Sequence, residues 1–228
     1  MTDRNYCLEV ELLAWKERFM VSLTISKCFR VGAGRTGLDV DLPIVSVKSN
    51  GKSSHLCANL SSSFRGILRK SVHGFLESTG LSERPGYVGV EDSLFGSAPQ
   101  IGYGQTKEGK LLIRLSNDAE EAELQTGKRT GVRVDFAFGS VVREALFTYE
   151  YLTNEKGSIK LSFTVSPSYP LTDEESTALL AGINSLRYCG YGGFASRGMG
   201  IIEDVKIDEG FLRHSTPLLK AALTEDAS

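Results

Sequence analysis

Apolar and polar residues alternate with the period of a β-strand in two stretches of the chain. Apolar side chains occupy every second position in 19–25 and again in 159–165. This period places one row of side chains on each face of a sheet and is typical of half-buried strands, so we expect strands over 19–31 and 158–165. Residues 110–115 and 200–207 are rich in aliphatic residues, and we expect further strands there.

Two other stretches repeat their apolar residues every three or four positions, which indicates amphipathic helices. The first follows three serines at 61–63, and we expect a helix over 62–79 with a serine N-cap and an end near Thr79-Gly80. The second opens with Thr172, and Glu175 follows three residues later. This spacing predicts a capping box at the start of a helix over 172–187.

Taken in order, these elements predict a β-α-β-β-α-β arrangement, an α+β fold of the ferredoxin-like type. We expect a single domain over 1–228, with insertions at about 32–60 and about 116–155. The second insertion is predicted to hold a β-hairpin with strands 132–142 and 145–152. Residues 81–110 are expected to form a loop, and the chain beyond Asp208 is expected to be a polar tail.

Composition narrows the classes of protein to which the chain can belong. Hydrophobic residues make up 41% of the sequence, enough for a sizeable core. The formal net charge of −2 argues against a free-standing nucleic-acid binder but leaves room for a local basic face. The four cysteines form no Cys-x-x-Cys pair, so we expect no zinc site. No apolar run is long enough for a membrane span or a signal peptide, so we expect a cytoplasmic protein without a membrane partner.

A glycine-rich stretch at 190–200 carries the clearest candidate chemistry. Five of its eleven residues are glycine, and Ser196 and Arg197 lie among them. Two readings stay open: a tight turn between a helix and a strand, or a cradle in which Ser196 and Arg197 bind a phosphate. The spacing Gly190-x-Gly192-x-x-Ala195 matches a dinucleotide fingerprint, but it follows a helix and precedes a strand, the reverse of the required order.

Basic residues elsewhere suggest further anion contacts. Arg65 and Arg69 lie four residues apart, on one face at the start of the first predicted helix, where they either grip phosphates or form a solvated basic face. His73 stands among apolar helix residues, and we expect it to be packed rather than catalytic. The predicted hairpin carries cations and two aromatic side chains suited to stacking on bases: Lys128, Arg129, Arg133, Phe136 and Phe138.

Six short stretches, in order along 19–207, resemble the RAMP superfamily of CRISPR-associated proteins. They are residues 29–34, 41–45, 62–69, 94–97, 131–135 and 192–200. The likeness is greatest to the backbone subunits of type III effector complexes. The chain departs from the family pattern at Asn59-Leu60-Ser61, where Pro-Gly often precedes the double serine, and at Ser46-Val47-Lys48, where a basic residue usually follows the acid-x-Pro segment.

The resemblance implies a subunit that binds CRISPR guide RNA, stacks with other RAMP subunits and the large subunit, and kinks a guide–target duplex with its hairpin. In catalytic members a loop aspartate cuts the target RNA; here this is Asp41, with Asp39 as the alternative. A divalent metal ion, Mg or Mn, would be held by Asp41. The residues that the resemblance and the local pattern assign to RNA binding are Ser62, Ser63, Arg65, Arg69, Lys128, Arg129, Arg133, Ser196 and Arg197.

Three alternatives remain open at this point. The first is a scaffold subunit of the same complex that binds guide RNA without cutting. The second is a stand-alone CRISPR RNA-processing ribonuclease, and the third is an adaptor that binds only protein.

Overall fold

A four-stranded antiparallel sheet lies at the centre of the structure. The structure is a computed structural model and describes residues 15–32, 47–49, 52–54, 60–97, 106–116, 124–135, 137–155 and 157–224. The strands follow one another across the sheet in the order β5-β8-β1-β9. Their bounds are Leu111–Leu115, Ile159–Pro167, Phe19–Ile25 and Ile202–Ile207.

The alternating sequence pattern explains why this sheet has one apolar face. In the pairing of β1 with β8, Val21 lies opposite Phe163 and Leu23 opposite Leu161, and all four side chains are buried. The ring of Phe64 stacks on Phe163 with their centroids 4.1 Å apart. The apolar face of the sheet and the helix above it therefore share one hydrophobic core.

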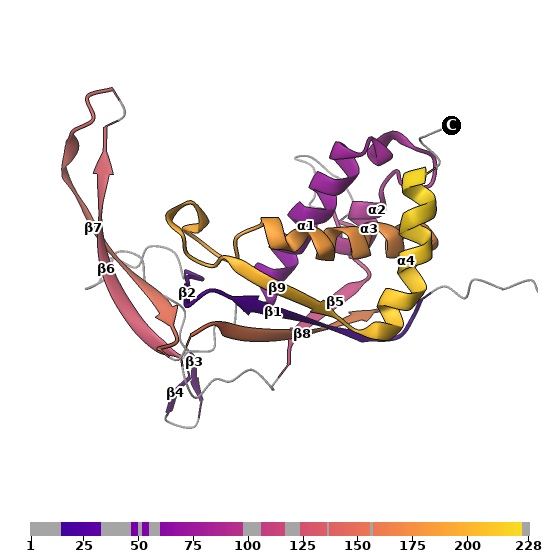
Figure 1. Cartoon of the computed structure of the whole chain (residues 1–228), viewed down its shortest axis with the longest axis horizontal. Helices are drawn as coiled ribbons and strands as arrows, with labels where there is room; N and C mark the ends of the chain where they lie inside the picture. Colours follow the sequence, from indigo (N-terminus) through magenta and orange to yellow (C-terminus); the bar gives the residue numbers. More distant parts are fainter. Residues whose placement is uncertain are drawn as a thin grey trace, which may run out of the picture.

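The helices lie on one side of this sheet (Figure 1). They are α1 (Leu60–Ser78), α2 (Val90–Phe95), α3 (Asp173–Ser185) and α4 (Glu209–Thr224). The predicted capping box is confirmed, because Thr172 Oγ1 accepts from the Glu175 N–H and Glu175 Oε2 accepts from the Thr172 N–H. None of the helices in the described part of the chain is long and apolar enough to cross a membrane.

The chain order of the central elements is β1, α1, β5, β8, α3, β9, the β-α-β-β-α-β order expected from the sequence. Every pair of neighbouring strands in the sheet is antiparallel. The α+β class is thus confirmed.

A long hairpin projects away from the helices (Figure 1). Its strands are β6 (Gln125–Val134) and β7 (Val141–Thr153), and β7 also pairs with the short β2 (Cys28–Phe29). A separate two-stranded sheet joins β3 (Val47–Ser49) to β4 (Lys52–Ser54). Single turns of 3-10 helix complete the elements: η1 (Leu81–Glu83), η3 (Leu186–Tyr188) and η4 (Ala195–Arg197).

Several expected boundaries were wrong. The first strand, expected over 19–31, ends at Ile25, and Cys28–Phe29 forms a separate strand that pairs with the hairpin. The predicted strand 132–142 runs across the hairpin tip, where Asp135 Oδ1 accepts from the Ala137 N–H and the two strands reverse. Residues 81–110 contain η1 and α2 rather than only loop, and the expected polar tail beyond Asp208 is the helix α4. The ring of Phe211 stacks on Phe19 at 4.0 Å, and this contact anchors α4 to the sheet.

Candidate nucleic-acid interface

The glycine loop, residues 190–200, folds back on itself as a narrow extension of the sheet. The Tyr191 N–H donates to Gly200 O at 2.7 Å, and Gly190 forms an antiparallel bridge with Ile201. The side chain of Tyr191 is fully buried, and its hydroxyl donates to Leu60 O at 2.8 Å. The loop is therefore fixed to the beginning of α1, as its place in the predicted fold requires.

Two glycines in this loop are needed for close approach of backbones. Gly192 has a φ of 81°, and a Cβ atom there would collide with the carbonyl oxygen of Arg30. Gly200 has a φ of 67°, and a Cβ atom there would collide with Tyr191 O. Only glycine combines a positive φ with the absence of this Cβ, so both positions are structural.

Most of the loop's N–H groups are already used within the chain. Gly193 donates to Arg30 O at 2.7 Å and Gly200 donates to Cys28 O at 2.8 Å. The N–H groups of Arg197, Gly198 and Met199 donate to carbonyls of the 3-10 turn η4 and the residue before it. These bonds make the loop a rigid turn, so an anion bound here would be held mainly by its side chains.

Arg197 is the exposed side chain that this turn presents. Its guanidinium carbon lies 4.8 Å from the ring centroid of Phe194 and 5.4 Å from that of Phe147 on β7. Among the described residues, its side chain makes no hydrogen bond or ion pair. Two aromatic rings thus orient a cation by cation–π attraction while its N–H donors remain available. Ser196 is exposed beside it.

A second arginine lies beneath the loop. Arg30 is buried, and its guanidinium carbon is 5.3 Å from the Phe194 ring centroid. Burial lowers the pKa of Arg30, and the nearby Glu150 and Tyr149 oppose that shift. Tyr149 itself packs on Phe194 at 4.7 Å. The loop and β7 are consequently joined by one cluster in which arginine side chains and aromatic rings pack together, and Arg197 is its exposed member.

Some of the predicted RNA-binding residues of the hairpin are exposed to solvent. The Lys128 ammonium lies 3.8 Å from the Glu150 carboxylate and is 60% exposed. Arg129 is exposed and pairs across the ribbon with Tyr149. Phe138 at the tip is 83% exposed. The side chain of Arg133 and all of Phe136 lie outside the described parts of the structure.

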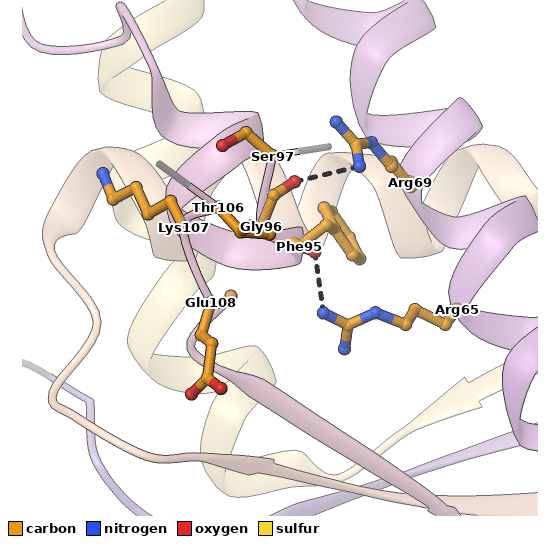
Figure 2. A pocket seen from close by; sticks show the side chains of 9 residues that line it. Arg65, Arg69, Phe95, Gly96, Ser97, Thr106, Lys107 and Glu108 are labelled. Carbon is orange, nitrogen blue, oxygen red and sulfur yellow. Dashed lines mark hydrogen bonds between the residues drawn. The ribbon is translucent and has the colours of Figure 1, made fainter. Parts of the chain in front are cut away.

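Arg65 and Arg69 are engaged within the fold rather than displayed on a solvated face, and we call them with their partners the arginine clamp. Arg65 donates to Leu111 O at 2.5 Å and to Phe95 O at 2.8 Å. Arg69 donates to Gly96 O at 3.0 Å, as Figure 2 shows, and forms ion pairs with Glu91 and Asp92. The clamp fastens α1 to α2 and to the edge strand β5.

Burial and the neighbouring Arg69 lower the pKa of Arg65. Both arginines line a surface pocket of about 440 Å³ between α1 and the segments around Gly96 and Lys107 (Figure 2). Ser62 is exposed and Ser63 is half-buried in the first turn of α1, which begins at Leu60 rather than after the serines. Ser61 has a structural role, since its hydroxyl accepts from the Leu115 N–H.

The clamp and the glycine loop do not share a contact residue. Arg65 and Arg69 bind the segment from Glu91 to Leu111, whereas Arg197 packs on the hairpin. By these contacts, Arg65 and Arg69 belong to one structural unit and Arg197 to another. The expectation that His73 is packed was wrong: it is 59% exposed, and its Nδ1 lies 2.8 Å from Glu91 Oε2.

The expected cleavage residues, Asp39 and Asp41, lie outside the described residues. Within the described ranges, no cluster of three or more His, Cys, Asp or Glu side chains could hold a metal ion. The residues that sequence reasoning missed are Arg30, Phe147 and Tyr149, which build the platform under Arg197. Phe147 and Tyr149 were indicated only by their place in the predicted hairpin, and Arg30 only by its place in the stretch 29–34 that resembles the family.

Comparison with known families agrees with this architecture. A search of curated proteins found no significant match. The model of the RAMP superfamily matches residues 60–203, well over half of the chain, from the start of α1 into β9. The matched region includes the arginine clamp, the hairpin and the glycine loop. The chain therefore belongs to the RAMP superfamily, whose role is CRISPR-associated.

Proposed function

We propose that this chain is a guide-RNA-binding backbone subunit of a type III CRISPR effector complex. The observation that carries the proposal is Arg197, a solvent-exposed cation held between the rings of Phe147 and Phe194. Family membership supplies the CRISPR-associated role, and the local chemistry supports RNA as the ligand.

The arrangement suits a phosphodiester backbone. A guanidinium group presents its N–H donors in a planar fork that matches two phosphate oxygens. The rings fix the plane of that fork in advance, so less side-chain entropy is lost when a phosphate binds. Ser196 adds a hydroxyl donor next to it, and the positive charge of Arg30 below the loop strengthens the attraction.

The hairpin extends this contact. Lys128 and Arg129 are exposed on β6, the strand that pairs with the strand carrying Phe147, and Arg133 follows on the same strand. In this proposal the guide backbone runs from the glycine loop along β6. On α1, Ser62 and Ser63 are the better candidates for RNA contact, because the clamp already engages Arg65 and Arg69.

The test is the affinity for a labelled CRISPR repeat RNA at fixed salt concentration. Arg197→Ala removes the fork and is expected to weaken binding at least tenfold, since a charge-assisted hydrogen bond contributes about 1.5–3 kcal/mol. Arg187→Ala is the matched control, because Arg187 is also an exposed arginine near the loop but lies by Asp204 at 3.8 Å. Equal affinities for all three proteins would reject the platform as the binding site.

Cleavage of target RNA is the second part of the proposal. We assign it to Asp41, with Asp39 as the alternative, and to a divalent metal ion, Mg or Mn, that Asp41 would hold. A general base typically contributes about 10²–10⁴ in rate. Complexes reconstituted with Asp41→Ala should therefore assemble and bind guide RNA but cut target RNA at least a hundredfold more slowly.

Asp39→Ala is the matched control for this experiment. Loss of cutting with Asp39→Ala alone would move the assignment to that residue. Undiminished cutting by both variants would reject a catalytic aspartate in this loop. A wild-type complex that binds target without cutting it would assign the chain to the scaffold class.

A further inference from the structure

The face of the central sheet that the helices leave uncovered, which we call the open face, has a composition unlike the rest of the molecule. Alternate residues of β1 and β8 point away from the core, and at the middle of the sheet they are small hydroxyl residues. Ser22 lies opposite Ser162, and their hydroxyl oxygens are 2.9 Å apart. Thr24 and Thr164 continue this hydroxyl surface along the two strands.

Three cations surround this centre, each from a different strand. Lys206 of β9 lies opposite Ser22, Lys160 of β8 lies opposite Thr24, and Arg114 of β5 lies opposite Thr164. All three are exposed, and no carboxylate of the described residues pairs with them. Strand and residue spacings place their backbone positions about 5–8 Å from the serine pair.

The open face also carries one acidic residue of β9, Asp204, whose charge offsets part of that of the cations. Asp204 lies opposite Thr24 of β1 and two residues from Lys206, whereas Glu203 is the extra residue at the irregularity in the pairing of β9 with β1. The Asp204 carboxylate is 3.8 Å from Arg187, which lies before the glycine loop. Three cations and one carboxylate leave the open face with a net positive charge in a chain whose formal net charge is −2.

The same composition indicates the kind of ligand. Interfaces between proteins are usually centred on aromatic or large apolar side chains and are depleted in lysine. Here the centre is Ser and Thr, and the exposed apolar residues Met20 and Leu112 lie toward one end of the face. No aromatic side chain of the four described strands points to this side, so stacking on bases has no platform here. Hydroxyls and cations are instead the groups that contact phosphates and sugars.

We propose that the open face is a second RNA-binding surface, which holds the phosphodiester backbone of a single strand without reading its bases. The inference rests on the proposed function in taking RNA as the ligand, but it uses none of the residues of the glycine loop or the hairpin. Small hydroxyl side chains let a strand approach the sheet closely, and the three cations flank its path.

The test uses a variant that removes these charges while keeping side-chain size: Arg114→Gln, Lys160→Gln and Lys206→Gln together. Binding of a labelled oligouridine is measured over a range of salt concentrations. Each phosphate contact in a single strand contributes about −0.7 to the slope of log affinity against log salt. Loss of three contacts is expected to make that slope shallower by about 2 and to weaken binding at low salt.

The matched control carries the same change of charge on the helical side: Lys70→Gln, Arg213→Gln and Lys220→Gln, three exposed residues of α1 and α4. Its slope should equal that of the wild type. Both variants should keep the wild-type Tm, since exposed substitutions of this kind change stability little.

The outcomes separate this inference from the proposed function. A slope that is unchanged in the open-face variant, while Arg197→Ala still weakens RNA binding, overturns the inference and leaves the proposed function standing. A shallower slope with no effect of Arg197→Ala supports the inference and rejects the glycine-loop platform. No RNA binding by the wild type overturns both. An unchanged slope with loss of co-assembling subunits would assign the face to protein contact and also overturn the inference.

Discussion

Replacing Arg65 by alanine tests the structural role of the arginine clamp. The side chain donates two hydrogen bonds to backbone carbonyls, Leu111 O at 2.5 Å and Phe95 O at 2.8 Å. It also lies over the Phe95 ring at 5.8 Å. These contacts join α1 to the edge strand β5 and to the end of α2, so their loss should be felt in the stability of the whole domain.

The magnitude follows from these contacts. A hydrogen bond with a charged partner contributes about 1.5–3 kcal/mol, and the half-exposed position of Arg65 favours the lower end of that range. The cation–π contact adds roughly 0.5 kcal/mol. We expect Arg65→Ala to lower the free energy of unfolding by about 2–4 kcal/mol and the Tm by roughly 5–10 °C.

Chemical denaturation followed by circular dichroism measures this loss. Lys70→Ala, on the same helix but exposed, is the control and should change stability by less than about 0.5 kcal/mol. Arg65→Lys keeps the charge but not the fork, and should recover only part of the loss. A free energy of unfolding of Arg65→Ala within about 0.5 kcal/mol of the wild type would refute the claim that the arginine clamp stabilises the domain.

The same variant separates stability from RNA binding. Repeat-RNA affinity is measured well below the Tm, where the variant is folded. An affinity within about threefold of the wild type is expected if the clamp already uses the guanidinium group. A loss of more than about tenfold in folded protein would restore Arg65 to the RNA-binding residues that the resemblance implies.

Three further predictions concern the framework of the site. Glu175→Ala should lower the free energy of unfolding by about 2–4 kcal/mol, because Glu175 is only 3% exposed, completes the capping box and pairs with Lys110 at 2.8 Å. A denaturation midpoint equal to that of the wild type would contradict this prediction. Gly192→Ala should lower the Tm by several degrees, whereas Gly66→Ala, in an open helical position, should raise it slightly; equal effects would refute the close-approach argument. Tyr191→Phe should lower the free energy of unfolding by about 1–2 kcal/mol, because it removes the buried hydrogen bond to the carbonyl of Leu60, the first residue of α1. An unchanged free energy of unfolding would count against that bond.

The sequence was sufficient for the framework because burial imposes a regular spacing. The alternation of Val21, Leu23 and their neighbours predicted β1, and the capping box at Thr172 placed the start of α3 correctly. The order of these elements along the chain followed from the same spacing.

The spacing of apolar residues did not predict the hairpin turn or the last helix. Apolar residues recur from Val132 to Val142 on both sides of the hairpin tip, so periodicity alone could not locate the turn. Pro217 lies inside α4 and, with the polar residues around it, hid the helical spacing that begins at Phe211.

The candidate site was predictable only in part for the same reason. The glycine spacing identified Arg197 from local sequence. One of its two supporting rings, that of Phe147, is about 50 residues away in sequence, and the carbonyl partners of Arg65 are 46 and 30 residues away. A local pattern names a residue type at a position, but it does not show which groups the fold brings to it.

The central claim, binding of guide RNA by this chain, is tested most directly by the RNA that it carries. The full chain is expressed together with a CRISPR array and its neighbouring subunits, purified under conditions that preserve the complex, and its bound RNA is sequenced. The account predicts RNA with a repeat-derived 5′ tag, recovered in markedly lower yield with Arg197→Ala. Recovery of no RNA, or of cellular RNA without the tag in equal yield from both proteins, would contradict it.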